Sequence, residues 1–191
     1  MRRAALAVAL AAAISAGCAR TEREAAELCP ESDAPVVDSV LLAFLSRARA
    51  AHHAADLHER AGRTEAALAA LSELPSGPLP PGEPPLPEVR EVLADTQARI
   101  AELEDALGRR ERALESVASG LKWVPEPTYF RGRLLEVRGL IHERRAKELS
   151  EAGQAAAAEQ ARRAALESLE GAMKIQADVI ERSLEQHDGG G

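Results

Sequence analysis

The stretch from Gly108 to Pro125 constrains the fold most, because it marks where one helix starts and stops. Gly108 can adopt the positive φ that reverses a chain after a helix, and Pro125 cannot continue a helix. Between them, Val117 and Leu121 recur at helical spacing and predict a buried face. Ala113 is small enough to let two helices cross closely. The stretch therefore predicts a short helix that folds back on its predecessor.

The same spacing of a glycine and an alanine five residues later recurs at Gly62 and Ala67. It joins a long amphipathic helix predicted over 36–61 to a second helix, whose N-cap the pattern places at Thr64. This junction therefore predicts another helix hairpin earlier in the chain.

Two more hairpins follow in the sequence. The first consists of helices predicted over 88–107 and 108–124, and the second of helices over about 128–151 and 154–186. Both arms of the last hairpin extend seven residues further from its turn at Gly153 than the corresponding arms at the first turn. Because seven residues are nearly two helical turns, equal extension keeps the apolar faces together and predicts a projecting tip.

The Ala-Leu-Glu-Ser segment beginning at Ala113 returns at Ala165, in the matching helix of the last hairpin. A unit of two helices with this glycine, alanine and proline spacing resembles the tetratricopeptide repeat, a helix-turn-helix unit of about 34 residues. The resemblance covers about residues 45–180. It implies an all-α fold of antiparallel helix-hairpin repeats, a TPR-like superhelix of about three units.

Composition agrees with helices and excludes several functions. Hydrophobic residues make up 46% of the chain but aromatic residues only 2%, which argues against a β-sandwich or barrel. The formal net charge is −7, so the chain lacks the basic surface that nucleic acids require. We therefore expect no nucleic-acid partner.

The first 17 residues are typical of a secretory signal: Arg2 and Arg3 precede an apolar run over 4–14 that is too short to span a membrane. Ser15-Ala16-Gly17-Cys18 then resembles a bacterial lipobox, although Leu is commoner where Ser15 stands. The resemblance implies lipidation of Cys18 and a membrane contact through that lipid. In the lipobox pattern, an aspartate directly after the cysteine favours retention in the inner membrane. Ala19 stands there instead, so the resemblance implies attachment to the outer membrane, facing the periplasm. The alternative is an ordinary cleaved signal with a chance cysteine.

Three further segments complete the domain organisation. Residues 18–35 are polar and predict a lipidated N-terminus and flexible tether. The helical domain covers 36–186, interrupted by seven prolines over 75–87, which predict a stiff, non-helical linker. Residues 187–191 predict a disordered tail.

The repeat resemblance implies that the first helix of each unit faces a groove that binds a partner. The groove positions it implies are Arg49, His52, Asp56, Glu59, Arg60, Asp95, Glu102, Asp105, Arg133, Glu136, Glu143 and Arg144. Their mixed charge suits a polar peptide or protein surface, and simple solvation is the alternative.

We expect no catalytic residues, cofactor or metal, because no nucleophile elbow, phosphate loop or haem attachment pattern is present. His52 and Asp56 share a helix face, but neighbouring histidines do not complete a ligand set. The sequence thus favours a lipid-anchored scaffold for an unidentified envelope protein or peptide. A solute-binding or transport-accessory lipoprotein and a purely structural envelope bundle remain open.

Overall fold

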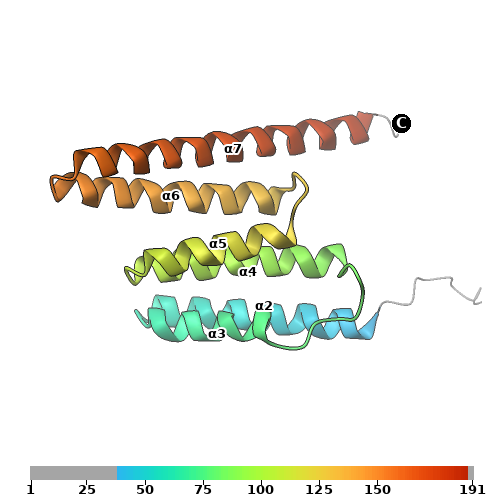
Figure 1. Ribbon diagram of the computed structural model, residues 1–191. Coiled ribbons are helices and arrows are strands. Elements are labelled where there is room, and N and C mark those ends of the chain that lie inside the picture. The colour runs from blue at the N-terminus through green and yellow to red at the C-terminus, as the bar shows by residue number, and fades with distance from the viewer. Residues whose placement is uncertain (1–37, 189–191) are drawn as a thin grey trace, which may run out of the picture. The chain divides into compact units, whose positions relative to one another are not determined.

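The structure is a computed structural model that describes residues 38–188, and every regular element in that range is a helix (Figure 1). The all-α prediction is therefore confirmed for these residues. The helices are α2 (Ser39–Arg60), α3 (Thr64–Ser76), α4 (Pro87–Ala106), α5 (Arg110–Trp123), α6 (Tyr129–Glu151) and α7 (Ala155–Asp188). The predicted signal, the tether, Cys18 and the tail from residue 189 lie outside the described range.

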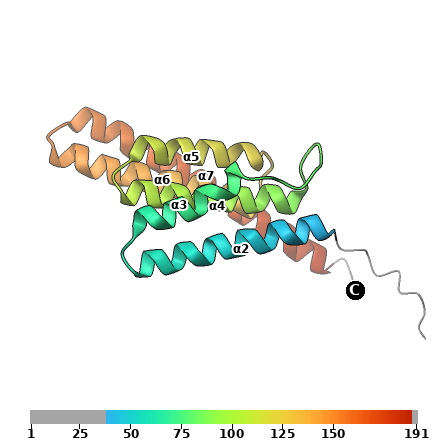
Figure 2. The same cartoon turned by 90° about the horizontal axis from the view of Figure 1, so that it is seen from below.

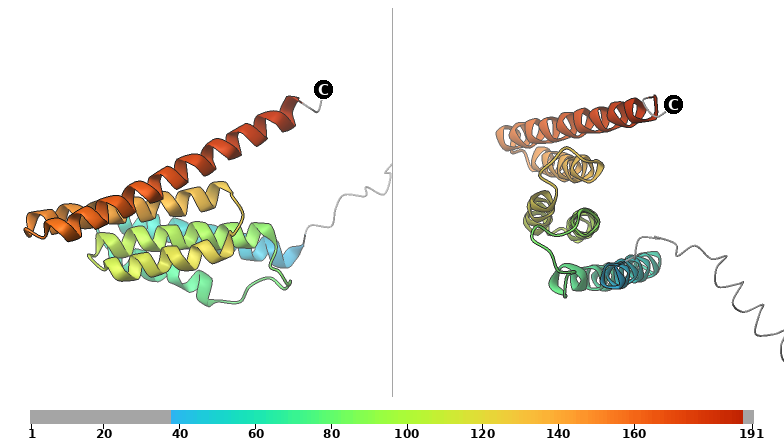
Figure 3. Two further views of the ribbon diagram at one scale, coloured as in Figure 1. Left: turned by 45° about the horizontal axis from the view of Figure 1, so that its top comes forward. Right: turned by 90° about the vertical axis from the view of Figure 1, so that its right-hand side faces the viewer.

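The helices pack as consecutive pairs, α2 with α3, α4 with α5 and α6 with α7, and the pairs follow one another in chain order (Figures 1 and 2). Figure 3 shows α2, α4 and α6 along one side, with α3 and α5 on the other. Helix α4 contacts four other helices, whereas α7 contacts only α6 among the described helices. Within residues 38–188, each pair therefore packs only against the pairs next to it in the chain.

Three glycines form the turns inside the pairs, as the sequence predicts. Gly62, Gly108 and Gly153 have φ of 70°, 75° and 73°. After each, the next backbone N–H returns to a carbonyl five residues earlier, over 2.8–2.9 Å. This closure satisfies the free carbonyls at a helix end and requires a left-handed residue, which glycine adopts without strain.

The apolar core lies between successive pairs rather than within one centre. One cluster joins α2 and α3 to α4 around Leu71, and another joins α4 and α5 to α6 around Leu134. Ala67 and Ala113, the predicted close-packing alanines, are fully buried. Between α6 and α7 the contact uses small residues instead, since a Cβ added at Gly139 would lie 2.6 Å from the Leu169 side chain.

The structure corrects several predicted helix boundaries. Thr64 is the first residue of α3 rather than its cap, and Arg63 occupies the N-cap position without a side-chain hydrogen bond. Pro75 lies inside the last turn of α3, so the non-helical linker is 77–86 rather than 75–87. Pro87 begins α4, where its missing N–H would have no partner in any case.

At the other end, α7 continues to Asp188, two residues into the predicted disordered tail. The guanidinium of Arg182 bonds the carbonyl of Pro127 over 2.7 Å, which fastens this end of α7 to the loop before α6. The turn between α6 and α7 extends beyond those of the other two pairs, as the matched lengthening of its arms predicts (Figures 1 and 3).

Candidate functional site

Ion pairs connect the helices that lie on the α2, α4 and α6 side. Arg99 of α4 donates through Nη2 to Asp56 Oδ1 over 2.8 Å and to Glu59 Oε2 over 2.9 Å, both on α2. The hydrogen bond from Arg99 lowers the pKa of the Asp56 carboxyl. One guanidinium thus fixes two carboxylates of the neighbouring helix in place.

The next helix carries a looser counterpart, in which an arginine approaches two carboxylates as ion pairs without forming a hydrogen bond. Arg133 of α6 places Nε 3.1 Å from Asp95 Oδ1 and Nη2 3.6 Å from Glu102 Oε2, both on α4. Burial raises the pKa of Glu102, against the opposing effect of Arg133 and Arg99. We call the six residues of these two clusters the α2–α4–α6 surface: Asp56, Glu59, Asp95, Arg99, Glu102 and Arg133.

A hydrogen bond between His52 and Thr96 lies beside this surface. The Thr96 hydroxyl is buried and donates to the Val92 carbonyl over 2.8 Å, so its oxygen is free to accept. His52 Nε2 lies 3.0 Å from that oxygen, which assigns the proton of the neutral ring to Nε2. Burial lowers the pKa of His52, while the nearby Asp95 carboxylate opposes the shift.

Asp105 was expected in the groove, but the structure buries it: its side chain is 1% exposed. It accepts from Arg110 Nε of α5 over 3.0 Å and also from Arg144 of α6. Arg110 reaches on to Glu148, with Nη2 2.7 Å from Oε1. Asp105 therefore joins three helices and cannot meet a partner, and Arg144 is engaged in the same cluster.

The other predicted groove residues are accessible. Arg49, Arg60 and Glu136 are exposed. Arg49 contributes to a depression of about 640 Å³ that also includes His52 and Asp56. The structure thus brings together half of the twelve predicted positions, namely His52, Asp56, Glu59, Asp95, Glu102 and Arg133. It leaves Arg49, Arg60, Glu136 and Glu143 exposed around them.

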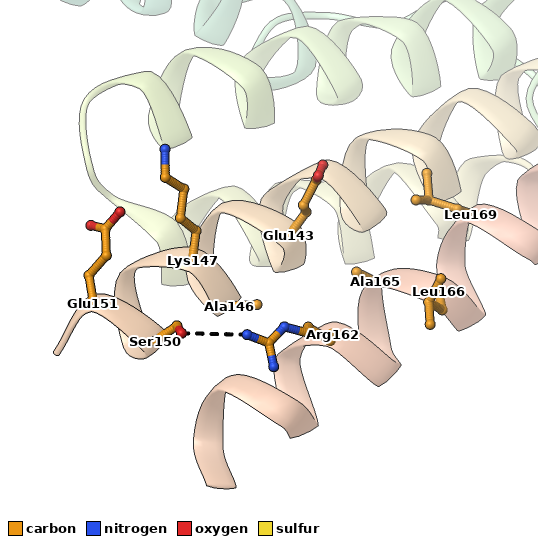
Figure 4. Close-up of a pocket in the computed structure, with 9 residues that line it drawn as sticks. All are labelled: Glu143, Ala146, Lys147, Ser150, Glu151, Arg162, Ala165, Leu166 and Leu169. Carbon is orange, nitrogen blue, oxygen red and sulfur yellow. Dashed lines mark hydrogen bonds between the residues drawn. The ribbon is translucent and has the colours of Figure 1, made fainter. Parts of the chain in front are cut away.

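Two further depressions continue this side of the stack. One of about 530 Å³ lies over Glu59, Arg99, Glu102 and Arg133. The other, of about 570 Å³, lies between α6 and α7, and its floor includes Ala165, Leu166 and Leu169 (Figure 4). In Figure 4, Arg162 reaches across its end to Ser150, with Nη2 3.5 Å from the hydroxyl.

The sequence could have supplied one residue that its repeat resemblance missed. Arg99 lies four residues after Asp95 and three before Glu102, which places all three on one face of α4. No sequence pattern predicts the apolar depression between α6 and α7, because an apolar residue such as Leu166 is equally compatible with a position in the core.

No group of three or more His, Cys, Asp or Glu side chains within residues 38–188 is arranged to ligate a metal ion. In the same residues, no helix has the length and apolar character to cross a membrane. Comparison of the chain with protein-family models, curated proteins and solved structures gives no match.

Proposed function

We propose that this protein is a TPR-like lipoprotein, anchored through Cys18 to the outer membrane and facing the periplasm, that binds a partner protein on the α2–α4–α6 surface. One observation carries the proposal. Charged side chains from three successive pairs lie in order along one side and are fixed there by cross-helix ion pairs.

Fixed charges favour specific recognition. A side chain already bonded to its neighbour loses less conformational entropy on binding than a free one. The α2–α4–α6 surface carries four carboxylates and two guanidinium groups, so an acidic excess remains after the ion pairs form. A polar protein or peptide surface with basic groups complements this arrangement.

The membrane anchor rests on the first 18 residues. An N-terminal pair of arginines, an apolar run and a cysteine at a lipobox-like position are what lipid attachment needs. Attachment through that lipid would keep the scaffold at the membrane. We propose no catalytic role, cofactor or metal for it.

A solute-binding role has less support. Small-molecule sites are enclosed and largely apolar, with a few placed polar groups. The depression at Arg99 and Arg133 is open and mostly lined by charged or small side chains. Its chemistry therefore favours a macromolecular partner over a buried solute.

The test compares two sides of the stack by photo-crosslinking in living cells. We expect a benzophenone amino acid at Arg49 or Glu136, on the groove side, to give an adduct with an envelope protein. The matched positions Glu73 and Glu115 are exposed on α3 and α5 and should give none.

A second step links the adduct to the charges of the surface. With the crosslinker at Arg49, Glu136→Arg should reduce the adduct strongly, whereas Glu115→Arg should leave it unchanged. Equal adducts from both sides, or adducts indifferent to Glu136→Arg, would contradict the scaffold proposal.

A further inference from the structure

A row of large apolar side chains along α7 is more than half exposed to solvent. Leu166, Met173, Ile180 and Leu184 are 58%, 62%, 61% and 62% exposed. Their spacing of seven, seven and four residues places them on one face of the helix. We call these four residues the α7 row. Four exposed large apolar side chains aligned on one helix face indicate a candidate interaction surface.

Most of the α7 row lies off the face that α7 uses within the chain, although Leu166 also borders the depression between α6 and α7. Helix α7 packs on α6 through small buried residues such as Ala165, Ser168 and Ala172. Exposed polar residues, including Glu167 and Lys174, lie on the flank away from α6. Because α6 is the only described helix that contacts α7, no other helix in residues 38–188 covers the row.

We propose that a second copy of this chain covers the α7 row from Met173 to Leu184, with the two α7 helices antiparallel about a twofold axis at Ala177. Ala177 lies on the same face, four residues after Met173 and three before Ile180. It is exposed and small, so two helix backbones can approach closely there. The axis then places Met173 of each copy between Ile180 and Leu184 of the other.

The charges beside the row favour this orientation. Lys174 and Glu181 occupy one flank, three residues before and four residues after Ala177. In the antiparallel pair they lie alongside each other across the interface, which gives two symmetric ion pairs. In a parallel pair the same flank of the two copies would lie on opposite sides of the interface, so Lys174 and Glu181 could not pair with each other. The flank is thus complementary to itself only when the helices run in opposite directions.

The proposal is independent of the scaffold function, because it concerns α7 alone. The first test is sedimentation equilibrium of the full chain in density-matched detergent with a reducing agent. We expect a dimer that Met173→Glu and Ala177→Glu weaken at least about tenfold in dissociation constant. Leu57→Glu is the matched control, because Leu57 is 50% exposed on α2 and should not alter the dimer.

A charge exchange tests the register. Lys174→Glu and Glu181→Lys should each weaken the dimer, and the double variant should restore it, because the ion pair re-forms with its signs exchanged. Circular dichroism checks that each variant stays helical. Failure of the double variant to recover dimerisation while remaining folded would overturn the proposed register.

Disulfide crosslinking tests the orientation, in a chain with Cys18→Ser and Cys29→Ser. Ala177→Cys should crosslink two copies, since the two residues meet at the axis. Leu166→Cys should not, because antiparallel pairing separates the two copies of residue 166 by about 33 Å along the helices. Efficient crosslinking at residue 166, or a monomer at every concentration in the first test, would overturn the proposal.

Discussion

Asp105 links three helices, although its position in the sequence predicts a side chain on the exposed groove. Its carboxylate is buried and accepts hydrogen bonds from Arg110 and Arg144, so it connects α4 to α5 and α6. A buried carboxylate is costly unless paired, and a buried guanidinium that loses its partner is costly in turn. The residue therefore contributes to the alignment of neighbouring pairs.

Asp105→Asn should reduce the free energy of unfolding. The loss should lie near the lower end of the about 3–5 kcal/mol seen when a buried ion pair loses one partner. The lower end applies because Arg110 keeps Glu148 and Arg144 is half exposed. Urea unfolding followed by circular dichroism measures the change. The matched control, Glu136→Gln, removes an exposed carboxylate and should stay within about 0.5 kcal/mol of the parent.

His52 gives the stack a dependence on pH with a definite sign. Burial lowers its pKa in the folded chain, with Arg99 and Arg133 acting in the same direction and Asp95 and Asp56 opposing. Between the ordinary histidine pKa of 6.5 and the lowered pKa of the folded chain, the unfolded chain therefore holds a proton on His52 that the folded chain does not. Stability then falls as pH decreases from 6.5 toward the lowered folded value.

His52→Gln should flatten this decline while keeping a donor for Thr96. The measurement is the urea midpoint at a series of pH values between 7 and 5. His53→Gln, at an exposed neighbouring position, is the control and should retain the slope of the parent. A slope unchanged by His52→Gln would show that another group causes the acid sensitivity.

At the scale of elements, the pair α6–α7 depends on glycine for its close contact. Gly139 is buried in α6, and an added Cβ would lie 2.6 Å from Leu169 Cγ and 3.3 Å from the Ala165 carbonyl. Gly171 on α7 differs, since its nearest neighbour is the end of the Leu135 side chain at 3.3 Å. Comparing an alanine substitution at each of the two glycines thus distinguishes the effect of crowding from the effect of helix propensity.

Gly139→Ala should destabilise the chain, because an overpacking cost of about 1–3 kcal/mol exceeds the roughly 0.5–1 kcal/mol gained by replacing a helical glycine. Gly171→Ala gains the same propensity with less crowding and should change stability by less than about 1 kcal/mol. Thermal unfolding of both variants compares them. Equal effects would mean that α7 can shift to accommodate the added methyl group.

The local features of these elements could be read from sequence because short-range rules fix them. A glycine after an apolar stripe predicted each left-handed turn, and small residues five positions later predicted the buried Ala67 and Ala113. The prediction for Asp105 failed for a longer-range reason. Helical periodicity places it on the side of Asp95, but the way α6 crosses α4 decides whether that side is open or covered.

At the scale of the whole molecule, the proposed anchor makes a simple prediction. Cys18→Ala should abolish palmitate labelling and release the chain from the membrane fraction, while its circular dichroism stays that of the parent. The matched control is Cys29→Ala, which removes the other cysteine and should retain both labelling and membrane attachment. A Cys18→Ala chain that still labels and fractionates with membranes would exclude the lipoprotein assignment.

The confinement of α7 to a single helical neighbour also determines how the molecule can open. Within residues 38–188 of a single copy, releasing α7 breaks only its contacts with α6 and the Arg182 bond to the preceding loop, whereas releasing α4 disrupts contacts with four helices. Amide hydrogens of α7 should therefore exchange with solvent through a partial opening of lower free energy than the one that exposes α4. When α7 detaches briefly, helices α2 to α5 and their apolar clusters stay packed. Local opening at this end of the stack therefore does not unfold the other helices.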